Sequence, residues 1–274
     1  MLEQPAPYQN HILAALPVDA QNRLFPQLQL VSLPLGKALH ECGECISHVY
    51  FPTDAIVSLM NVMEDGASAE ISAIGNEGLI GVSLFTGGET NTTRAVVLSG
   101  GRAYRLSGKR LRDEIKSHSE LEHLLLRYMQ SMMTQMGQTA VCNRHHSIDQ
   151  QLCRWLLLSL DRLHSDCLVM TQELISNMLG VRRESVTEAA GKLRRQGVIE
   201  CHRGKITVLD RRQLEKLSCE CYAVLKVEIA RLMFYSTREP RRPLIVRGEQ
   251  NPIMPGNNGT GHKKMIDRHR SRHL

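Results

Sequence analysis

Hydrogen-bonding side chains are concentrated at the start of the stretch 182–195, which reads RRESVTEAAGKLRR. A periodic set of apolar residues predicts a helix here: Val186, Ala189, Ala190 and Leu193. Arg182 and Arg183 in its first turn oppose the helix macrodipole, so they are poor choices for stability. Donors at this place suit a helix whose N-terminal residues meet base edges in the DNA major groove. From these residues alone, a solvated face of an ordinary helical bundle is an equal alternative.

The segment before it predicts a second helix, from Thr171 to Gly180. Thr171 is a suitable N-cap, and Glu173 lies near the positive end of the helix. Gly180 ends the helix, because glycine takes the left-handed conformation at little cost. One apolar face is expected: Leu174, Ile175, Met178 and Leu179. Two helices joined by so short a turn must cross, which is the geometry of a helix-turn-helix unit.

A β-hairpin is predicted directly after these helices, between Gly197 and Asp210. Its two apolar runs are separated by Arg203-Gly204-Lys205, and a glycine in such a turn is a hairpin signal. A hairpin in this position is a wing, and we expect Arg203 and Lys205 at its tip to contact phosphate. Residues 169–209 contain seven Lys or Arg and four Asp or Glu, which favours an anionic partner.

Short strands punctuated by glycine are predicted between Leu28 and Leu106. The clearest are Val49–Phe51, Ala55–Met60, Ala69–Ile74 and Arg94–Leu98. Many short strands with glycine turns indicate a closed or jelly-roll β domain. The chain therefore combines an N-terminal β domain with a C-terminal helical one.

Helical patterns dominate after Leu106. One apolar set has nearly coiled-coil spacing: Leu121, Leu125, Met129, Met132 and Met136. We expect it to form a dimer interface, although packing on its own domain is the plain alternative. Further helices are predicted over Ser147–Leu163, with Trp155 as a core anchor, and over Arg211–Tyr235.

The 274 residues suffice for two domains, and no apolar run reaches the ~20 residues that a membrane helix needs. Nothing at the start resembles a signal peptide, so a cytoplasmic protein without membrane contact is expected. The net charge of +6 arises in residues 237–274, which hold nine Lys or Arg against three Asp or Glu. Prolines and glycines there predict a loose, disordered basic tail.

Eight cysteines in a cytoplasmic chain are expected to be reduced, and most of them to be small core residues. Cys42 and Cys45 form a C-x-x-C motif which, with Cys142, His145 and His146, suggests zinc or an iron–sulfur cluster. A structural zinc site usually shows a second paired motif, and we identify none, so no metal is expected. The sequence also has no Walker loop, dinucleotide fingerprint, nucleophile elbow or HExxH motif, so neither an enzyme nor a cofactor is predicted.

The order of helix-turn-helix and wing, with the run GVRRESVTEAAGKLRRQGVI, resembles the Crp/Fnr family of bacterial transcription regulators. The motifs LGK, CGE, HVYFP and GNEGLIG upstream resemble the β-roll of cyclic-nucleotide-binding domains. The resemblance covers roughly Leu28 to Tyr235 and implies an α+β fold. Its expected parts are a jelly-roll-like β-roll sensor (1–110), a dimerisation helix (111–145), a winged helix-turn-helix domain (146–236) and the tail (237–274).

The resemblance also implies the DNA contacts. Thr171 and Gln172 are expected to bind phosphate, and Arg182 and Arg183 to bind guanine or phosphate. Glu184 matches a glutamate that the family uses in base readout. The remaining expected contacts are Ser185, Thr187, Glu188, Lys192 and Arg203. Glu188 stands where familiar members carry a guanine-reading arginine, so the half-site is predicted to differ from theirs.

In cyclic-nucleotide-binding domains a glutamate holds the ribose and an arginine the cyclic phosphate. The best-aligned positions here depart from that pattern, since Val82 and Ser83 follow Gly81 and Ala95 follows Arg94. Glu77, Gly81 and Arg94 are the candidate effector-pocket residues, and cAMP is not expected to bind in the usual way. The expected partners are double-stranded DNA, a second copy of the chain, RNA polymerase and an unidentified small molecule. The alternative is a ligand-binding or redox- or metal-sensing module that acts on a protein partner.

Overall fold

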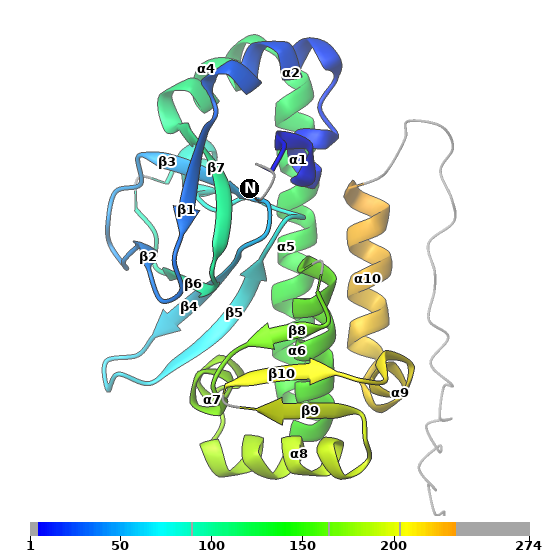
Figure 1. Ribbon diagram of the computed structural model, residues 1–274. Helices are drawn as coiled ribbons and strands as arrows, with labels where there is room; N and C mark the ends of the chain where they lie inside the picture. Colours follow the sequence, from blue (N-terminus) through cyan, green and yellow to red (C-terminus); the bar gives the residue numbers. More distant parts are fainter. Residues whose placement is uncertain (1–4, 89, 164, 203, 234–274) are drawn as a thin grey trace, which may run out of the picture. The chain divides into compact units, whose positions relative to one another are not determined.

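Figure 1 shows the chain as a computed structural model, which describes residues 5–233 except 89, 164 and 203. The N-terminal segment contains η1 (Pro7–Gln9), α1 (His11–Ala14), α2 (Val18–Leu24) and η2 (Phe25–Gln27). Asn10 caps α1 by accepting from the backbone amides of Ile12 and Leu13. Its side-chain amide donates to the carbonyls of Pro52 and Gly78, which fastens this segment to the β domain.

The β domain consists of two antiparallel sheets, with orders β1-β7-β3 and β2-β6-β4-β5. The strands are β1 (Gln29–Leu33), β2 (Ala38–His40), β3 (His48–Pro52), β4 (Ile56–Val62), β5 (Ser68–Ile74), β6 (Arg94–Ser99) and β7 (Gly101–Ser107). All four clearest strand predictions are confirmed. Residues of both sheets, such as Phe51 and Val97, share one buried core, and α3 (Ser83–Thr86) follows the loop after β5.

Two helices, rather than the single helix predicted over 111–145, follow β7. They are α4 (Gly108–Ser117) and the 27-residue α5 (Ser119–His145). His118 separates them because its backbone is extended, with φ −146° and ψ 121°. Leu121, Leu125 and Met132 of α5 are buried in the β-roll core. The long helix is therefore part of the N-terminal domain's core over its first half.

The C-terminal half begins with α6 (Ile148–Arg162), which Ser147 and Gln150 open with a reciprocal capping box. It continues with β8 (Cys167–Val169), α7 (Gln172–Leu179), α8 (Arg183–Arg195), β9 (Ile199–His202) and β10 (Lys205–Val208). The predicted hairpin is confirmed, with Ile206 opposite Cys201 and Val208 opposite Ile199. The strand β8 adds to the other edge of β10.

The last described helices are α9 (Arg211–Leu217) and α10 (Glu220–Met233), so the prediction of one helix over 211–235 is wrong. Ser218 interrupts it with extended backbone, φ −73° and ψ 163°. Residue 235 and the tail 237–274 lie outside the described residues. In Figure 1, α10 runs alongside α5.

Residues of the β-roll and of the C-terminal half pack into one buried cluster. It includes Ile56, Met60 and Leu98 from the strands together with Trp155 and Leu179. All described elements belong to the unit Met1–Ser236. None of the described helices has the length and apolarity that a membrane crossing requires. The division into a sensor, a dimerisation helix and a DNA-binding domain stays a prediction.

Candidate nucleic-acid interface

The two helices predicted for the helix-turn-helix unit are present as α7 and α8, and they pack against each other. The hydroxyl of Thr171 accepts from the amide of Leu174 at 3.2 Å, which caps α7. Gly180 ends α7 with φ 66°. Arg182 occupies the N-cap of α8 but forms no side-chain cap. The positive end of α8 is therefore open to an anion.

The first turn of α8 carries exposed charged side chains. Arg182, Arg183 and Glu184 are exposed. Within the described part of the chain, their side chains form no ion pair or hydrogen bond with another residue. Below them, the apolar face predicted for α8 is buried: Val186, Ala189, Ala190 and Leu193. The helix thus buries one face and presents its donors and a carboxylate acceptor to solvent.

Thr187, another predicted DNA contact, is hydrogen-bonded within the chain. Its hydroxyl donates to Oε1 of Gln172 at 2.8 Å and lies 3.0 Å from the carbonyl of Arg183. The bond joins the first turn of α7 to α8. Thr187 and Gln172 therefore hold the two helices in register, and Ser185 beside them is half-buried.

Lys192 is also engaged within the chain. Its Nζ lies 3.1 Å from Asp149 of α6 and 3.2 Å from Glu188. The hydrogen bonds to Asp149 and Glu188 raise the pKa of Lys192 above its ordinary value. The charge of Lys192 thus ties α8 to α6, and its contact with DNA stays a prediction. Glu188, which is largely exposed, shares in this pairing.

The wing places Lys205 at the exposed start of β10, directly after the turn and opposite His202 of β9 in the strand register. Gly204 has φ 76°, as its place in a tight hairpin requires. Arg203, the other predicted phosphate contact of the wing, lies outside the described residues.

The predicted dimer seam is mostly buried within the chain itself. Leu121 and Leu125 are each 1% exposed, and Met132 is 6% exposed. Met129 and Met136 are half-buried. Their coiled-coil spacing reflects packing of α5 on the β-roll, which the sequence pattern does not distinguish from packing on a partner. The exposed apolar residues of α5 are instead Leu126, Met133 and Val141.

The three predicted effector-pocket residues are not brought together. Glu77 pairs with Arg162 of α6 at 2.7 Å and accepts from the amide of Gly75. Arg94 pairs with Glu41 at 2.9 Å. At Gly81 a Cβ atom would meet the carbonyl of His48 at 3.1 Å, so this glycine serves close backbone packing. The ribose-and-phosphate arrangement expected of a cyclic-nucleotide site is absent from these residues.

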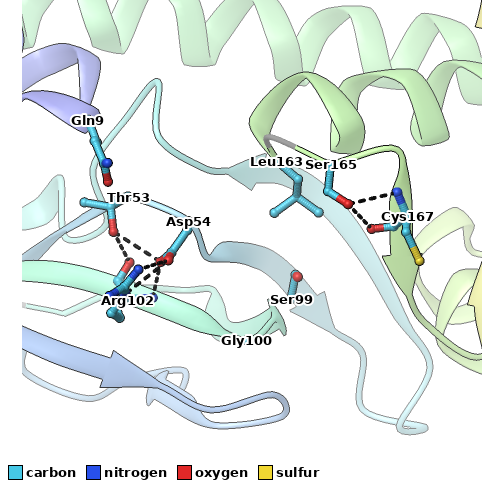
Figure 2. Close-up of a pocket in the computed structure, with 9 residues that line it drawn as sticks. All are labelled: Gln9, Thr53, Asp54, Ser99, Gly100, Arg102, Leu163, Ser165 and Cys167. Atoms are coloured by element: carbon cyan, nitrogen blue, oxygen red, sulfur yellow. Dashed lines mark hydrogen bonds and ion pairs between the residues drawn. The ribbon is translucent and has the colours of Figure 1, made fainter. Parts of the chain in front are cut away.

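Two pockets lie where the β-roll meets the C-terminal half. Figure 2 shows one of about 370 Å³, in which Arg102 and Asp54 face each other and are paired at 2.8 Å. The other, of about 570 Å³, is lined by Arg94 from β6 and by α7 residues including Glu173 and Asn177. Of the three candidate effector residues, only Arg94 lines one of these two pockets.

A buried carboxyl group lies at the contact between β5 and α6. The indole Nε1 of Trp155 donates to Oε1 of Glu70 at 3.2 Å. Burial raises the pKa of Glu70 above its ordinary value, against the hydrogen bonds and positive charges around it. Trp155, predicted as a core anchor, is 4% exposed and also contacts the β-roll.

This carboxyl group predicts a pH-dependent stability. A raised pKa in the folded state gives stability that is fully present below the unfolded pKa, about 4.3, and is lost as pH rises. Glu70→Gln removes the ionisation and keeps an oxygen for the indole. We expect the variant to melt higher than the parent at pH 7–8 and equally near pH 4, by thermal denaturation across pH. If the variant instead melts lower than the parent, by a difference that grows with pH, the folded protein favours the charged form of Glu70.

The chain is similar in sequence to a known DNA-binding domain and to known regulators. Residues 150–217 match the model of a Crp-like helix-turn-helix domain. The global nitrogen regulator of Nostoc sp. is 26% identical over 182 residues, which cover 63% of this chain and 82% of that protein. The global nitrogen regulator of Synechococcus elongatus is 24% identical over 193 residues, which cover 67% and 86%.

Solved structures share the fold. FixK2 from Bradyrhizobium japonicum aligns with a TM-score of 0.59 at 15% identity, over 70% of this chain and 98% of that one. A transcriptional regulator of the CRP/FNR family from Thermus thermophilus aligns with a TM-score of 0.55 at 21% identity, over 69% and 98%. With the α7–α8 unit and its wing, the matched Crp-like helix-turn-helix domain and the curated relatives show that the chain is a DNA-binding transcription regulator similar to proteins of the Crp/Fnr family.

Proposed function

We propose that two copies of this chain read a two-fold symmetric DNA site, with one α8 in each of two successive major grooves. The observation that carries the proposal is the exposed first turn of α8, where Arg182, Arg183 and Glu184 have no partner within the described residues. The guanidinium groups supply donors for guanine or phosphate, and the Glu184 carboxylate accepts from the amino group of cytosine. Thr171, exposed at the start of α7, supplies a phosphate contact.

The second copy is proposed to dock on the exposed stripe of α5, formed by Leu126, Met133 and Val141. These side chains are 54%, 64% and 51% exposed, on a helix whose opposite side is buried. Gly137 lies on the same stripe, and a Cβ there would meet nothing within 4 Å. A small residue of this kind lets a second helix approach closely. The stripe replaces the seam that spacing alone suggested.

Control is proposed to pass through the contact between the β-roll and the helix-turn-helix unit. The hydroxyl of Ser58 in β4 lies 3.3 Å from Sδ of Met178 in α7. The pocket lined by Arg94 lies beside α7, so a small molecule bound there would contact a DNA-positioning helix directly. With Glu77 held by Arg162, cAMP in its usual pose is not the proposed effector. RNA polymerase is a further proposed partner.

Glu184→Ala tests the docking of α8. Loss of the carboxylate should cost about 1–3 kcal/mol at one base position of each half-site, and so relax the preference there by roughly 5- to 150-fold. The preferences of parent and variant are compared by selection from a random duplex library. Glu64→Ala, in an exposed turn of the β-roll, is the matched control and should leave the selected sequence unchanged. An unaltered preference in Glu184→Ala would overturn the proposed docking.

A further inference from the structure

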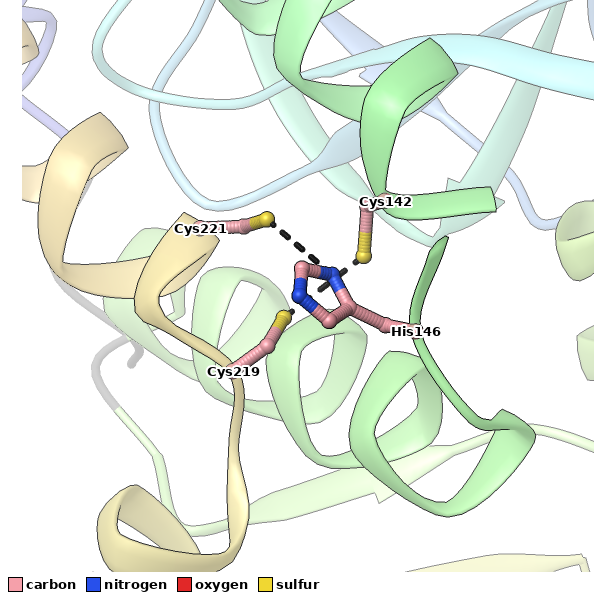
Figure 3. A group of neighbouring side chains, drawn as sticks. All are labelled: Cys142, His146, Cys219 and Cys221. Carbon is pink, nitrogen blue, oxygen red and sulfur yellow. Dashed lines mark hydrogen bonds between the residues drawn. The ribbon is translucent and has the colours of Figure 1, made fainter. Parts of the chain in front are cut away.

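Four side chains with metal-ligand atoms meet at the C-terminal end of α5. They are Cys142, His146, Cys219 and Cys221, and their ligand atoms all lie within 4.8 Å of one another (Figure 3). Cys142 lies in the last turn of α5, and His146 is the C-cap residue that follows the helix, with its backbone amide donating to the carbonyl of Cys142. Cys219 and Cys221 flank the first residue of α10, immediately after the break at Ser218.

We propose that these four residues bind a zinc ion as a structural site with three cysteines and one histidine. The Sγ atoms of Cys142 and Cys219 are 3.6 Å apart, and Sγ of Cys221 is 3.4 Å from Nδ1 of His146. In a tetrahedral site with zinc–sulfur bonds of about 2.3 Å, sulfur atoms lie about 3.8 Å apart. The observed separations of the ligand atoms are close to this distance. An iron–sulfur cluster places several atoms between its ligands and so needs them farther apart.

The surroundings of the four residues also fit a metal site. The other ring nitrogen of His146, Nε2, lies 3.2 Å from the carboxylate of Glu220. A carboxylate in this position fixes the histidine tautomer and leaves Nδ1 free for the metal. The amide of Gln138 donates to Sγ of Cys221 at 3.0 Å, as a donor to a ligating thiolate would. Both contacts orient ligands.

Burial favours a closed, structural role over a catalytic one. Cys142 and Cys221 are fully buried, and Cys219 is 4% exposed. Four protein ligands complete a tetrahedral shell and leave no position for water or substrate. Sulfur-rich sites of this composition favour zinc among the common divalent ions that prefer nitrogen and sulfur ligands.

The expectation that the sequence holds no metal site is thus revised. It depended on the lack of a second paired motif, but Cys219 and Cys221 form one, with a single residue between them. The pair Cys142-x-x-x-His146 is the other half. The C-x-x-C motif at Cys42 and Cys45 is exposed and is not part of the cluster.

The site joins elements on both sides of the connection between α5 and α6. Cys142 comes from the long helix α5 and His146 from its C-cap, whereas Cys219 and Cys221 come from the junction of α9 and α10, after the wing. A bound ion would link the end of the long helix to the end of the DNA-binding half. If the zinc proposal fails, the DNA-reading proposal still stands, because zinc content and DNA selection are measured independently.

The test is the metal content of the full-length protein, purified without chelator and analysed by plasma mass spectrometry. One zinc per chain is expected, and Co²⁺ in its place should give the visible absorption of a tetrahedral thiolate complex. Cys219→Ser should lose both signals. Cys153→Ser changes a buried cysteine outside the cluster, and Cys42→Ser an exposed one, so both controls should keep one zinc.

Glu220→Gln covers the case in which Cys219→Ser does not fold. Glu220 is exposed, so folding should be unaffected, whereas loss of the carboxylate should weaken zinc binding about 10- to 100-fold. Competition with a chromophoric chelator measures this change. Folded protein that takes up neither zinc nor cobalt would overturn the proposal. So would metal that is lost with Cys42→Ser but kept with Cys219→Ser, or a Cys142–Cys219 disulfide in place of metal.

Discussion

Replacing Arg162 with methionine should lower the free energy of unfolding by about 3–5 kcal/mol, among the largest effects expected for one substitution in this chain. The side chains of Arg162 and Glu77 are 5% and 13% exposed, and Nε and Oε1 are 2.7 Å apart. Arg162 also donates to the carbonyl of Leu158. Methionine keeps much of the apolar bulk but leaves the Glu77 carboxylate buried without its counter-charge. Urea denaturation measures the change.

The matched control is Arg231→Met, the same replacement on another helix. Arg231 pairs with Glu228 at the surface, with side chains 51% and 22% exposed. An exposed pair of this kind contributes at most about 1 kcal/mol. The double variant Arg162→Met/Glu77→Leu should recover part of the loss, because the unpaired charge is gone. Equal effects of Arg162→Met and Arg231→Met would contradict the buried ion pair as a link between the β-roll and α6.

Met133→Glu should abolish the dimer and with it most specific DNA binding. A carboxylate on each copy would face its equivalent across the proposed α5 interface, where like charges repel and desolvation is costly. A single protomer reads one half-site, so affinity should fall toward the non-specific level, about 10³-fold or more. Sedimentation equilibrium measures the association, and titration of a selected DNA site measures the affinity.

Met63→Glu is the control for this substitution. Met63 is 64% exposed, as Met133 is, but lies in the turn between β4 and β5. It should leave both dimer and affinity unchanged. If the Met133→Glu variant is still dimeric and binds DNA with parental affinity, the α5 stripe is not part of the dimer interface. Met132→Leu on the buried side should alter stability more than association.

The parts of the fold with local signals could be predicted from the sequence. Thr171 and Gly180 mark the two ends of α7, because a hydroxyl cap and a left-handed glycine act within a few residues. The wing follows from two apolar runs around Gly204 for the same reason. The strand β8 could not be found this way, because it has only three residues and is defined by its pairing with β10, which is distant in the sequence.

Features that depend on tertiary contacts could not be predicted from the sequence. Leu121 and Leu125 have the spacing of an interface, but the β-roll covers them, and spacing carries no information about which surface does so. Lys192 and Thr187 lie at plausible reading positions, yet Asp149 and Gln172 engage them. The break at Ser218 has no glycine or proline to mark it.

The cluster of Cys142, His146, Cys219 and Cys221 also depends on tertiary contacts that the sequence does not reveal. Its two halves are separated by more than seventy residues, and each half alone is a weak motif. Only the folding of α10 back along α5 brings them together (Figure 1). The C-x-C spacing at Cys219 and Cys221 was the signal available, and it gains meaning from Cys142 and His146.

In vitro selection of duplex DNA from a random library by the purified, full-length protein tests the central claim most directly. A palindrome is predicted, with half-site centres about 10 base pairs apart or a multiple of that spacing, since the two α8 helices must enter grooves on one side of the duplex. Recovery of an asymmetric single site would contradict the dimer. Recovery of only a salt-sensitive background, with or without cell extract, would contradict specific reading by α8.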